Sequence, residues 1–341
     1  MNFTVDFLNF EQYTNLVEEY TMRQMSYQTD ILDAFTGVLN SLRNSFRGAF
    51  VFGLPITELD AALIWEPDGR LERRTHPENG EPIFPSWSWA GWIGKVTWFV
   101  KSHLPLASRV TWVDTQGVRF ASAELRGEEY AEMDSKSMES GTYFFKPDDP
   151  CRLYRYPIAP ESHRPTICLI TPGSEYLRFE ARSAIFQVTL DEDMDEMFGG
   201  VFNEDATLTL RDESGFRAGI IGVSSSVGLE VPAFYEFVAL SRTATMSSSD
   251  RSTWSIIPDT DEDCGKRPDP GLNEYDQAED DVDAMSAGFD TRKYSLEKPW
   301  PIYNVLMIQP GRTFSRRVGL GVCHVDAFNA AKTELKRVVL G

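Results

Sequence analysis

Apolar residues in the first fifty positions recur at steps of three and four, which is the spacing of one face of an α-helix. Two such series are separated by a polar break at residues 23–28, and Thr29 or Asp30 can cap the second helix. We therefore predict two helices packed as an antiparallel pair, and a third short helix over residues 56–65. The two apolar series are Phe7, Leu8, Phe10, Tyr13, Leu16, Val17 and Tyr20, then Ile31, Leu32, Phe35, Val38, Leu39 and Leu42.

After residue 84 the pattern changes to short runs of β-branched and aromatic residues, bounded by Gly, Pro and Asp. Runs spaced by roughly ten residues are typical of an antiparallel β-sandwich or β-barrel. The predicted strands cover residues 95–100, 109–113, 166–170, 176–179, 184–188, 206–210, 218–221, 234–240, 302–308, 317–322 and 336–340.

Two acidic segments interrupt this pattern. Residues 120–150 are weakly patterned, and we interpret them as an excursion from the fold. Residues 243–297 are rich in Ser and Asp and poor in large apolar residues, which predicts a disordered insertion. The predicted fold class is α+β: a helical region at 1–82 packed on an antiparallel β domain, sandwich or barrel-like, formed by 83–242 and 298–341.

Composition limits the classes of partner. The chain has 341 residues, of which 42% are hydrophobic and 12% aromatic, enough to bury a large core. The net charge of −19 repels phosphate backbones and anionic lipids, so we expect neither nucleic acid nor a membrane as partner. No secretory signal and no run of about 18 apolar residues occur, and we expect a cytoplasmic protein.

Motifs that carry chemistry are missing from the sequence. No GxGxxG, GxxxxGK[ST], HExxH, CxxC or GxSxG pattern occurs, so we assign no catalytic, cofactor-binding or metal-binding residue. The acidic run 191–196 lacks the Gly and terminal Glu of an EF-hand loop, and we interpret it as a solvated loop. We expect no cofactor.

The cysteines do not form a recognisable framework. They lie far apart, which favours free thiols in a reducing compartment. Cys323 precedes His324, but neighbours on a strand point to opposite faces, so we expect Cys323 to be buried and His324 exposed. The four cysteines are Cys151, Cys168, Cys264 and Cys323.

The most distinctive segment is Phe84-Pro-Ser-Trp-Ser-Trp-Ala-Gly-Trp92. In an extended chain Trp87 and Trp89 fall on one face, where exposed indoles could stack a sugar or a base. The same rings could instead form the wall between the helices and the sheet, which we favour because large aromatic residues usually build the core. Trp87, Trp89 and Trp92 are therefore candidates for either an interface or a ligand site.

Several blocks resemble, in the same order, the region that follows the HET domain in fungal heterokaryon-incompatibility (HET) proteins. The Pro85–Trp92 segment resembles a signature block of that region. Residues 20–27, with Arg23, resemble its YT-x-R-x-L-[ST] stretch, and residues 317–321, with Arg317, resemble its R-x-G-x-G block. Further blocks are at 30–39 (D-x-L-x-A-F-x-G-[IV]-L), 52–55 and 61–65 (GLP…ALLW) and 303–308 (YNVL-x-I).

The resemblance implies a role in nonself recognition and programmed cell death. The HET domain of such proteins lies upstream and is related to TIR domains, which suggests NAD-cleaving or death-signalling activity there. No residue of this chain matches the HET domain's motifs, so no catalytic residue is carried over. The resemblance implies that this chain is a fragment or a stand-alone relative of the region after the HET domain.

We therefore expect a non-enzymatic recognition or regulatory module with a protein partner, for which a HET domain in trans is the candidate. One alternative is a glycan- or small-ligand-binding β module that uses Trp87, Trp89 and Trp92. A second is a cryptic hydrolase or NADase. Arg23 and Arg317 are expected to pair with carboxylates and hold the interface between the helical and β parts.

Overall fold

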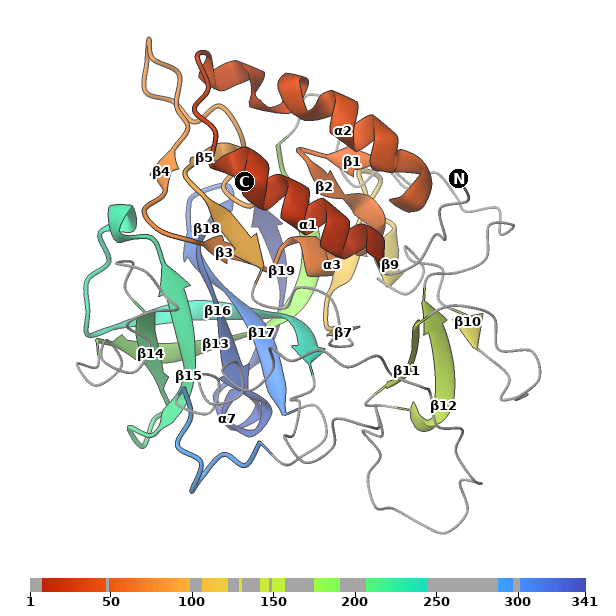
Figure 1. Ribbon diagram of the computed structural model, residues 1–341. Helices are drawn as coiled ribbons and strands as arrows, with labels where there is room; N and C mark the ends of the chain where they lie inside the picture. Colours follow the sequence, from red (N-terminus) through yellow and green to blue (C-terminus); the bar gives the residue numbers. More distant parts are fainter. Residues whose placement is uncertain are drawn as a thin grey trace.

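The computed structural model describes residues 8–46, 49–98, 106–121, 129–130, 142–146, 149–156, 175–190, 207–243, 288–296 and 301–341. Two helices cover one side of an antiparallel β structure (Figure 1). This arrangement confirms the predicted α+β class. The predicted strand at 166–170 and the acidic run at 191–196 lie outside the described residues.

Helices α1 (Leu8–Thr21) and α2 (Ile31–Phe46) form where the three- and four-residue spacing predicts them. The two helices pack through the rings of Tyr20 and Phe35, whose centroids are 4.6 Å apart. The Tyr20 hydroxyl also donates a hydrogen bond to the carbonyl of Ile31 (2.8 Å), which fixes the start of α2. A single 3-10 turn, η1 (Gln28–Asp30), leads directly into α2.

The main sheet closes into a six-stranded antiparallel barrel. The strands follow the order β13-β14-β15-β18-β17-β16, and β16 pairs again with β13. Val188 of β13, for example, faces Leu210 of β14 on one edge and Ala233 of β16 on the other. The barrel strands are β13 (Leu177–Thr189), β14 (Thr207–Arg211), β15 (Arg217–Val223), β16 (Ala233–Thr243), β17 (Ile302–Pro310) and β18 (Ser315–His324).

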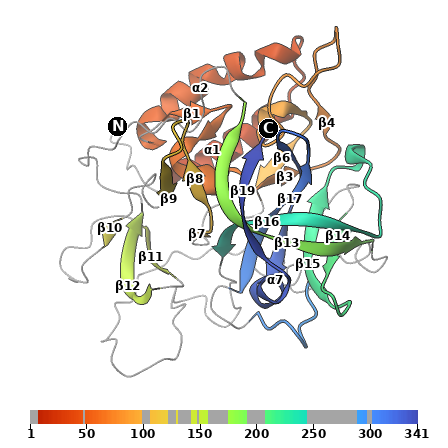
Figure 2. The same cartoon turned by 180° about the vertical axis from the view of Figure 1, so that it is seen from behind.

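Other strands extend the barrel wall. β19 (Glu334–Leu340) runs beside β13, as Figure 2 shows from behind. β7 (Leu106–Ser108) pairs with β16, whereas β8 (Thr111–Val113) lies between β13 and β9 (Arg119–Ala121). A separate sheet of β10 (Glu129–Tyr130), β12 (Asp149–Tyr156) and β11 (Thr142–Lys146) begins inside the predicted acidic excursion at 120–150 and extends past its end. It lies to one side of the barrel in both views.

The barrel contributes to two hydrophobic clusters, one inside it and one on its outer wall. On β17, Val305 and Met307 belong to the interior cluster, whereas Leu306 and Ile308 pack outward beneath the helical part. Both faces of β17 are therefore buried, which explains the uninterrupted apolar run at residues 305–308. The outer cluster runs without interruption from α1 to β19, across the predicted boundary at residue 82.

One end of the barrel is covered by two segments that sequence patterns did not reveal. Helix α7 (Val325–Ala330) inserts Phe328 against Tyr303, with ring centroids 5.2 Å apart. Residues 288–296 add Phe289 and Tyr294 to the interior cluster. Phe289 forms a β-bridge with Ala218. The expected disorder over 243–297 is therefore wrong for 288–296, because two aromatic rings anchor that stretch. Thr243 belongs to β16, and residues 244–287 lie outside the described residues.

Short elements connect the helices to the barrel. The third predicted helix ends early, because Trp65 belongs to a strand that pairs with Trp98. These elements are β1 (Phe50–Val51), β2 (Leu54–Pro55), η2 (Ile56–Glu58), α3 (Leu59–Ala62), β3 (Trp65–Pro67), β4 (Glu72–Arg73), η3 (Trp89–Gly91), β5 (Trp92–Ile93), β6 (Val96–Trp98) and η4 (Ser225–Val227).

Candidate functional site

The tryptophan segment 84–92 lies between the helical part and the barrel and is not an extended strand. Ser88 caps the η3 turn by accepting a hydrogen bond from the amide of Ala90 (2.9 Å). The same hydroxyl donates to the carbonyl of Phe52 (2.7 Å), which ties the turn to the chain before β2. The expectation that Trp87 and Trp89 share a strand face is wrong, because this turn interrupts the extended geometry.

All three indoles of the segment are buried. The exposed fractions of Trp87, Trp89 and Trp92 are 0%, 1% and 7%. Each ring N–H has a partner: the carbonyl of Glu175 for Trp87 (3.1 Å), the hydroxyl of Tyr13 for Trp89 (3.1 Å) and the carbonyl of Ser86 for Trp92 (3.0 Å). The alternative of an exposed stacking platform is wrong for these rings, since no open ring face remains for a sugar or a base.

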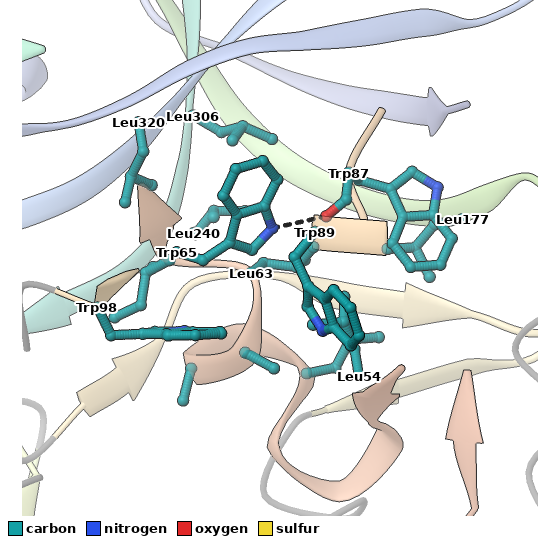
Figure 3. Close-up of a cluster of buried hydrophobic side chains, with 14 of the residues drawn as sticks. Leu54, Leu63, Trp65, Trp87, Trp89, Trp98, Leu177, Leu240, Leu306 and Leu320 are labelled. Atoms are coloured by element: carbon teal, nitrogen blue, oxygen red, sulfur yellow. Dashed lines mark hydrogen bonds between the residues drawn. The ribbon is translucent and has the colours of Figure 1, made fainter. Parts of the chain in front are cut away.

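A fourth indole completes the cluster. The ring N–H of Trp65 donates to the carbonyl of Trp87 (2.9 Å), as the dashed line in Figure 3 shows. Leu306 and Leu320 of the barrel wall lie on the other side of this ring (Figure 3). The tryptophan segment is therefore in contact with the barrel through Trp65 as well as through its own side chains.

Two arginines that sequence reasoning missed bind the backbone of this segment. Arg73 donates to the carbonyls of Phe84 (2.6 Å) and Gly91 (2.7 Å), and its guanidinium lies 4.9 Å from the centre of the Trp92 ring. Arg74 donates to the carbonyls of Ala90 (3.0 Å) and Trp92 (2.8 Å). A buried carbonyl without a donor costs free energy, and these guanidinium groups supply donors that a strand partner would otherwise provide.

Arg317 holds the interface, as expected, but chiefly through carbonyl groups and a ring. Its guanidinium donates to the carbonyls of Leu63 (2.7 Å) and Trp65 and lies 3.6 Å from the centre of the Trp65 ring. Its own amide donates to the hydroxyl of Ser86 (2.9 Å). Burial lowers the pKa of Arg317 to about 9, an effect that the nearby carboxyl of Glu66 opposes.

Glu66 is the carboxyl group that interacts electrostatically with Arg317. Burial raises the pKa of Glu66 to about 8; Arg317 opposes this shift and Asp68 adds to it. The carboxyl abuts the barrel wall, since a Cβ placed on Gly222 would lie 3.7 Å from its Oε2 atom. Both partners are shifted towards their neutral forms, because burial penalises the two charges more than their attraction repays.

Arg23 does not take part in the interface. It is exposed in the turn after α1, and within the part of the chain that the structure describes it makes no ion pair with a carboxylate. The role expected of Arg23 is filled by Arg74, which lies between the helical part and the tryptophan segment. Arg74 binds the side chain of Gln28 as well as the carbonyls of Ala90 and Trp92. We call Trp65, Trp87, Trp89, Trp92, Arg73, Arg74 and Arg317 the tryptophan–arginine junction.

The Cys323–His324 pair lies elsewhere, at the end of the barrel near α7. Both side chains are buried, so the expected exposure of His324 is wrong. The Nδ1 atom of His324 accepts from the amide of Asp326 (3.1 Å) and caps α7, while Nε2 lies 3.0 Å from the carbonyl of Ser295. Burial raises the pKa of the Cys323 thiol, which disfavours the reactive thiolate.

Neither a metal-binding cluster nor a membrane-spanning helix occurs in the described ranges. Among these residues, no group of three or more His, Cys, Asp or Glu side chains is arranged to hold a metal ion. None of the helices in the described ranges has the length and apolar character needed to cross a bilayer. No family model, curated protein or solved structure matches the chain.

Proposed function

We propose that this chain is a non-enzymatic recognition or regulatory module of the heterokaryon-incompatibility type, which acts in the cytoplasm through a protein partner. One observation carries the proposal. The sequence blocks that resemble HET proteins are far apart in the chain, yet in the structure they meet at the tryptophan–arginine junction. We infer that these blocks determine how the helical part packs on the barrel.

The contacts between blocks are direct. Tyr20 packs on Trp89, with ring centroids 6.3 Å apart. The hydroxyl of Ser88 donates to the carbonyl of Phe52 (2.7 Å). Tyr13, which lies outside the blocks, bridges the carbonyl of Gly53 and the ring N–H of Trp89. Arg317 reaches back to the carbonyl of Leu63 in the ALLW-like block. In these contacts one block supplies a side chain or a backbone group to another.

The chemistry of the junction favours a scaffold over an active site. The most perturbed carboxyl beside the junction, that of Glu66, faces Arg317 and the barrel wall at Gly222 and is 8% exposed. Perturbed pKa values accompany buried structural ion pairs as well as catalytic sites, and a catalytic acid must reach its substrate. The indoles are likewise buried against other side chains, so a small ligand that stacks on them has less support than a protein partner.

The test is a binding experiment with the full chain and a separately purified HET domain of a heterokaryon-incompatibility protein. We expect a saturable complex by calorimetry or biolayer interferometry, and loss of viability when both are expressed together in a fungal cell. Absence of a complex up to about 100 μM, well above the range of specific protein pairs, would contradict the proposal. Release of nicotinamide from NAD by the chain alone would contradict its non-enzymatic part.

A further inference from the structure

A cluster of arginine and aromatic side chains lies at the surface beside the tryptophan–arginine junction. Phe314, in the turn between β17 and β18, packs on Tyr176 just before β13, with ring centroids 5.2 Å apart. The guanidinium of Arg316 lies 5.9 Å from the centre of the Phe314 ring. Arg312 projects from the same turn, and both arginines are exposed, whereas the two rings are half-buried. We call Arg312, Phe314, Arg316 and Tyr176 the arginine–aromatic surface.

Positive charge on this surface is only partly balanced, by Glu175 next to Tyr176. Arg312 and Arg316 make no ion pair with any residue that the structure describes. Behind them, burial lowers the pKa of Arg73 to about 10, and the positive charge of Arg316 lowers it further. Glu175 opposes that shift and is the one described carboxylate that acts on Arg73, so an excess of positive charge remains.

The geometry suits a carboxylate. A guanidinium group held against an aromatic ring loses less freedom when it binds, and its planar fork matches the two oxygens of a carboxylate. The part of the Phe314 ring that Tyr176 and Gly341 leave uncovered offers apolar area next to the charge, which suits a side chain adjacent to that carboxylate. A peptide supplies both features within a few residues.

The overall charge selects against long polyanions. A net charge of −19 repels nucleic acid and anionic membranes at long range. Screening limits that repulsion to about 8 Å at physiological ionic strength, so a short ligand responds to the local arginines. A short acidic segment is consistent with both the long-range repulsion and the local attraction by the arginines.

We propose that the arginine–aromatic surface binds a short segment, rich in Asp or Glu and containing an aromatic residue, of a protein partner. This rests on the proposed function in that the partner is a protein. It adds where that partner docks and which chemistry it presents.

The experiment measures fluorescence anisotropy of a labelled short peptide of alternating Glu and Tyr added to the full chain. We expect saturable binding that weakens as salt is raised, and no binding of the matching Lys–Tyr peptide. Arg316→Glu should weaken binding by about tenfold or more, since it removes a charge-assisted contact to the carboxylate and adds a like charge. The matched control is Arg292→Glu, an exposed arginine in the 288–296 segment, which should change Kd less than about twofold.

Four results would overturn the proposal: no binding by the wild type, equal weakening by Arg316→Glu and Arg292→Glu, full displacement by millimolar inorganic phosphate, or tighter binding of a peptide of residues 259–283 from this chain. The last would make the chain's own acidic segment the occupant. If Arg316→Glu abolishes peptide binding but leaves HET-domain binding intact, the partner docks elsewhere and the proposed function stands. If the peptide binds and a HET domain does not, the surface stands and the proposed function fails.

Discussion

The barrel interior and the tryptophan–arginine junction are both closed to solvent, but their backbones are satisfied in different ways. Along β17 and β18 the pairing runs from Ile302 opposite His324 to Pro310 opposite Ser315, so neighbouring strands supply the hydrogen bonds. In the tryptophan segment turn-type backbone hydrogen bonds satisfy only some of the carbonyls, and the side chains of Arg73, Arg74 and Trp65 donate to others. The interior side chains therefore have to fill space, whereas those of the junction must also donate hydrogen bonds.

This difference predicts how each region responds to substitution. A smaller apolar side chain in the barrel leaves a cavity but keeps the backbone ladder. A junction side chain that loses its donor leaves a buried carbonyl unsatisfied, at about 1–3 kcal/mol for each group. Removing a polar group without much change in side-chain volume should thus destabilise the junction more than the barrel.

Arg317→Ala should cause the largest loss of stability. It removes the donor for the buried carbonyls of Leu63 and Trp65 and leaves a cavity beside the Trp65 ring, on which the guanidinium packs. We expect the free energy of unfolding to fall by about 3–5 kcal/mol, measured by urea titration followed by tryptophan fluorescence.

The adjacent Arg316 serves as the control, because it is exposed and Arg316→Ala should change stability by less than about 0.5 kcal/mol. If Arg317→Ala does not fold, Arg317→Lys keeps the charge but loses the planar fork and should give an intermediate loss. Equal stability of Arg317→Lys and wild type would show that charge alone matters and would refute the carbonyl-binding account.

Gly53→Ala should produce the next largest effect. Gly53 has φ of +86°, and a Cβ there would lie 2.6 Å from the Trp89 ring. Gly69 has φ of +104° with nothing within 4 Å of such a Cβ, so Gly69→Ala isolates the backbone strain, about 1–2 kcal/mol. We expect Gly53→Ala to cost about 2–4 kcal/mol, and similar thermal unfolding of the two variants would show that the close packing on Trp89 is unimportant.

Tyr13→Phe tests a single hydroxyl. That group donates to the carbonyl of Gly53 (2.9 Å) and accepts from Trp89 (3.1 Å), so its removal leaves two buried partners unsatisfied. We expect a loss of about 1–2 kcal/mol in chemical unfolding. Tyr303→Phe in the barrel is the matched change and should stay within about 0.5 kcal/mol; a reversed order would contradict the contrast between the two regions.

The parts of the fold that follow a periodic pattern could be predicted from the sequence. α1 and α2 bury one face, whereas β17 buries both faces. The helices therefore show apolar residues at three- and four-residue steps, and β17 shows a run of them. β13 was predicted as two strands because Glu180 and Arg182 interrupt its apolar run. In the structure Glu180 faces outward and is bonded to Arg119 (2.8 Å), so the strand continues through it. Barrel closure could not be predicted, since it depends on β13 pairing with both β14 and β16.

The junction was only partly predictable for a related reason. The tryptophans stand out in the sequence, and Arg317 lies in a recognisable block. Arg73 and Arg74 were missed because their partners are backbone carbonyls, which every residue possesses and which leave no pattern. A pair of arginines in an otherwise polar loop, close in sequence to an aromatic segment without strand alternation, is the signal that could have identified them.

The smallest expected effect is a dependence of stability on pH that originates at Glu66. Its pKa is raised to about 8 in the folded chain, above the value near 4.5 of the unfolded one, so the folded state holds a proton that the unfolded state has released. Stability therefore falls as the pH rises from about 4.5 to about 8, by at most about 1.4 kcal/mol per pH unit for one group.

Glu66→Gln keeps the shape of the protonated carboxyl without titrating, and its free energy of unfolding should fall less than that of the wild type between pH 7 and pH 8. Staying at or below pH 8 avoids the opposite contribution of Arg317, whose pKa is lowered to about 9. Parallel pH profiles for the two proteins would mean that Glu66 is ionised in the junction, and that the ion pair rather than the carbonyl contacts holds Arg317 in place.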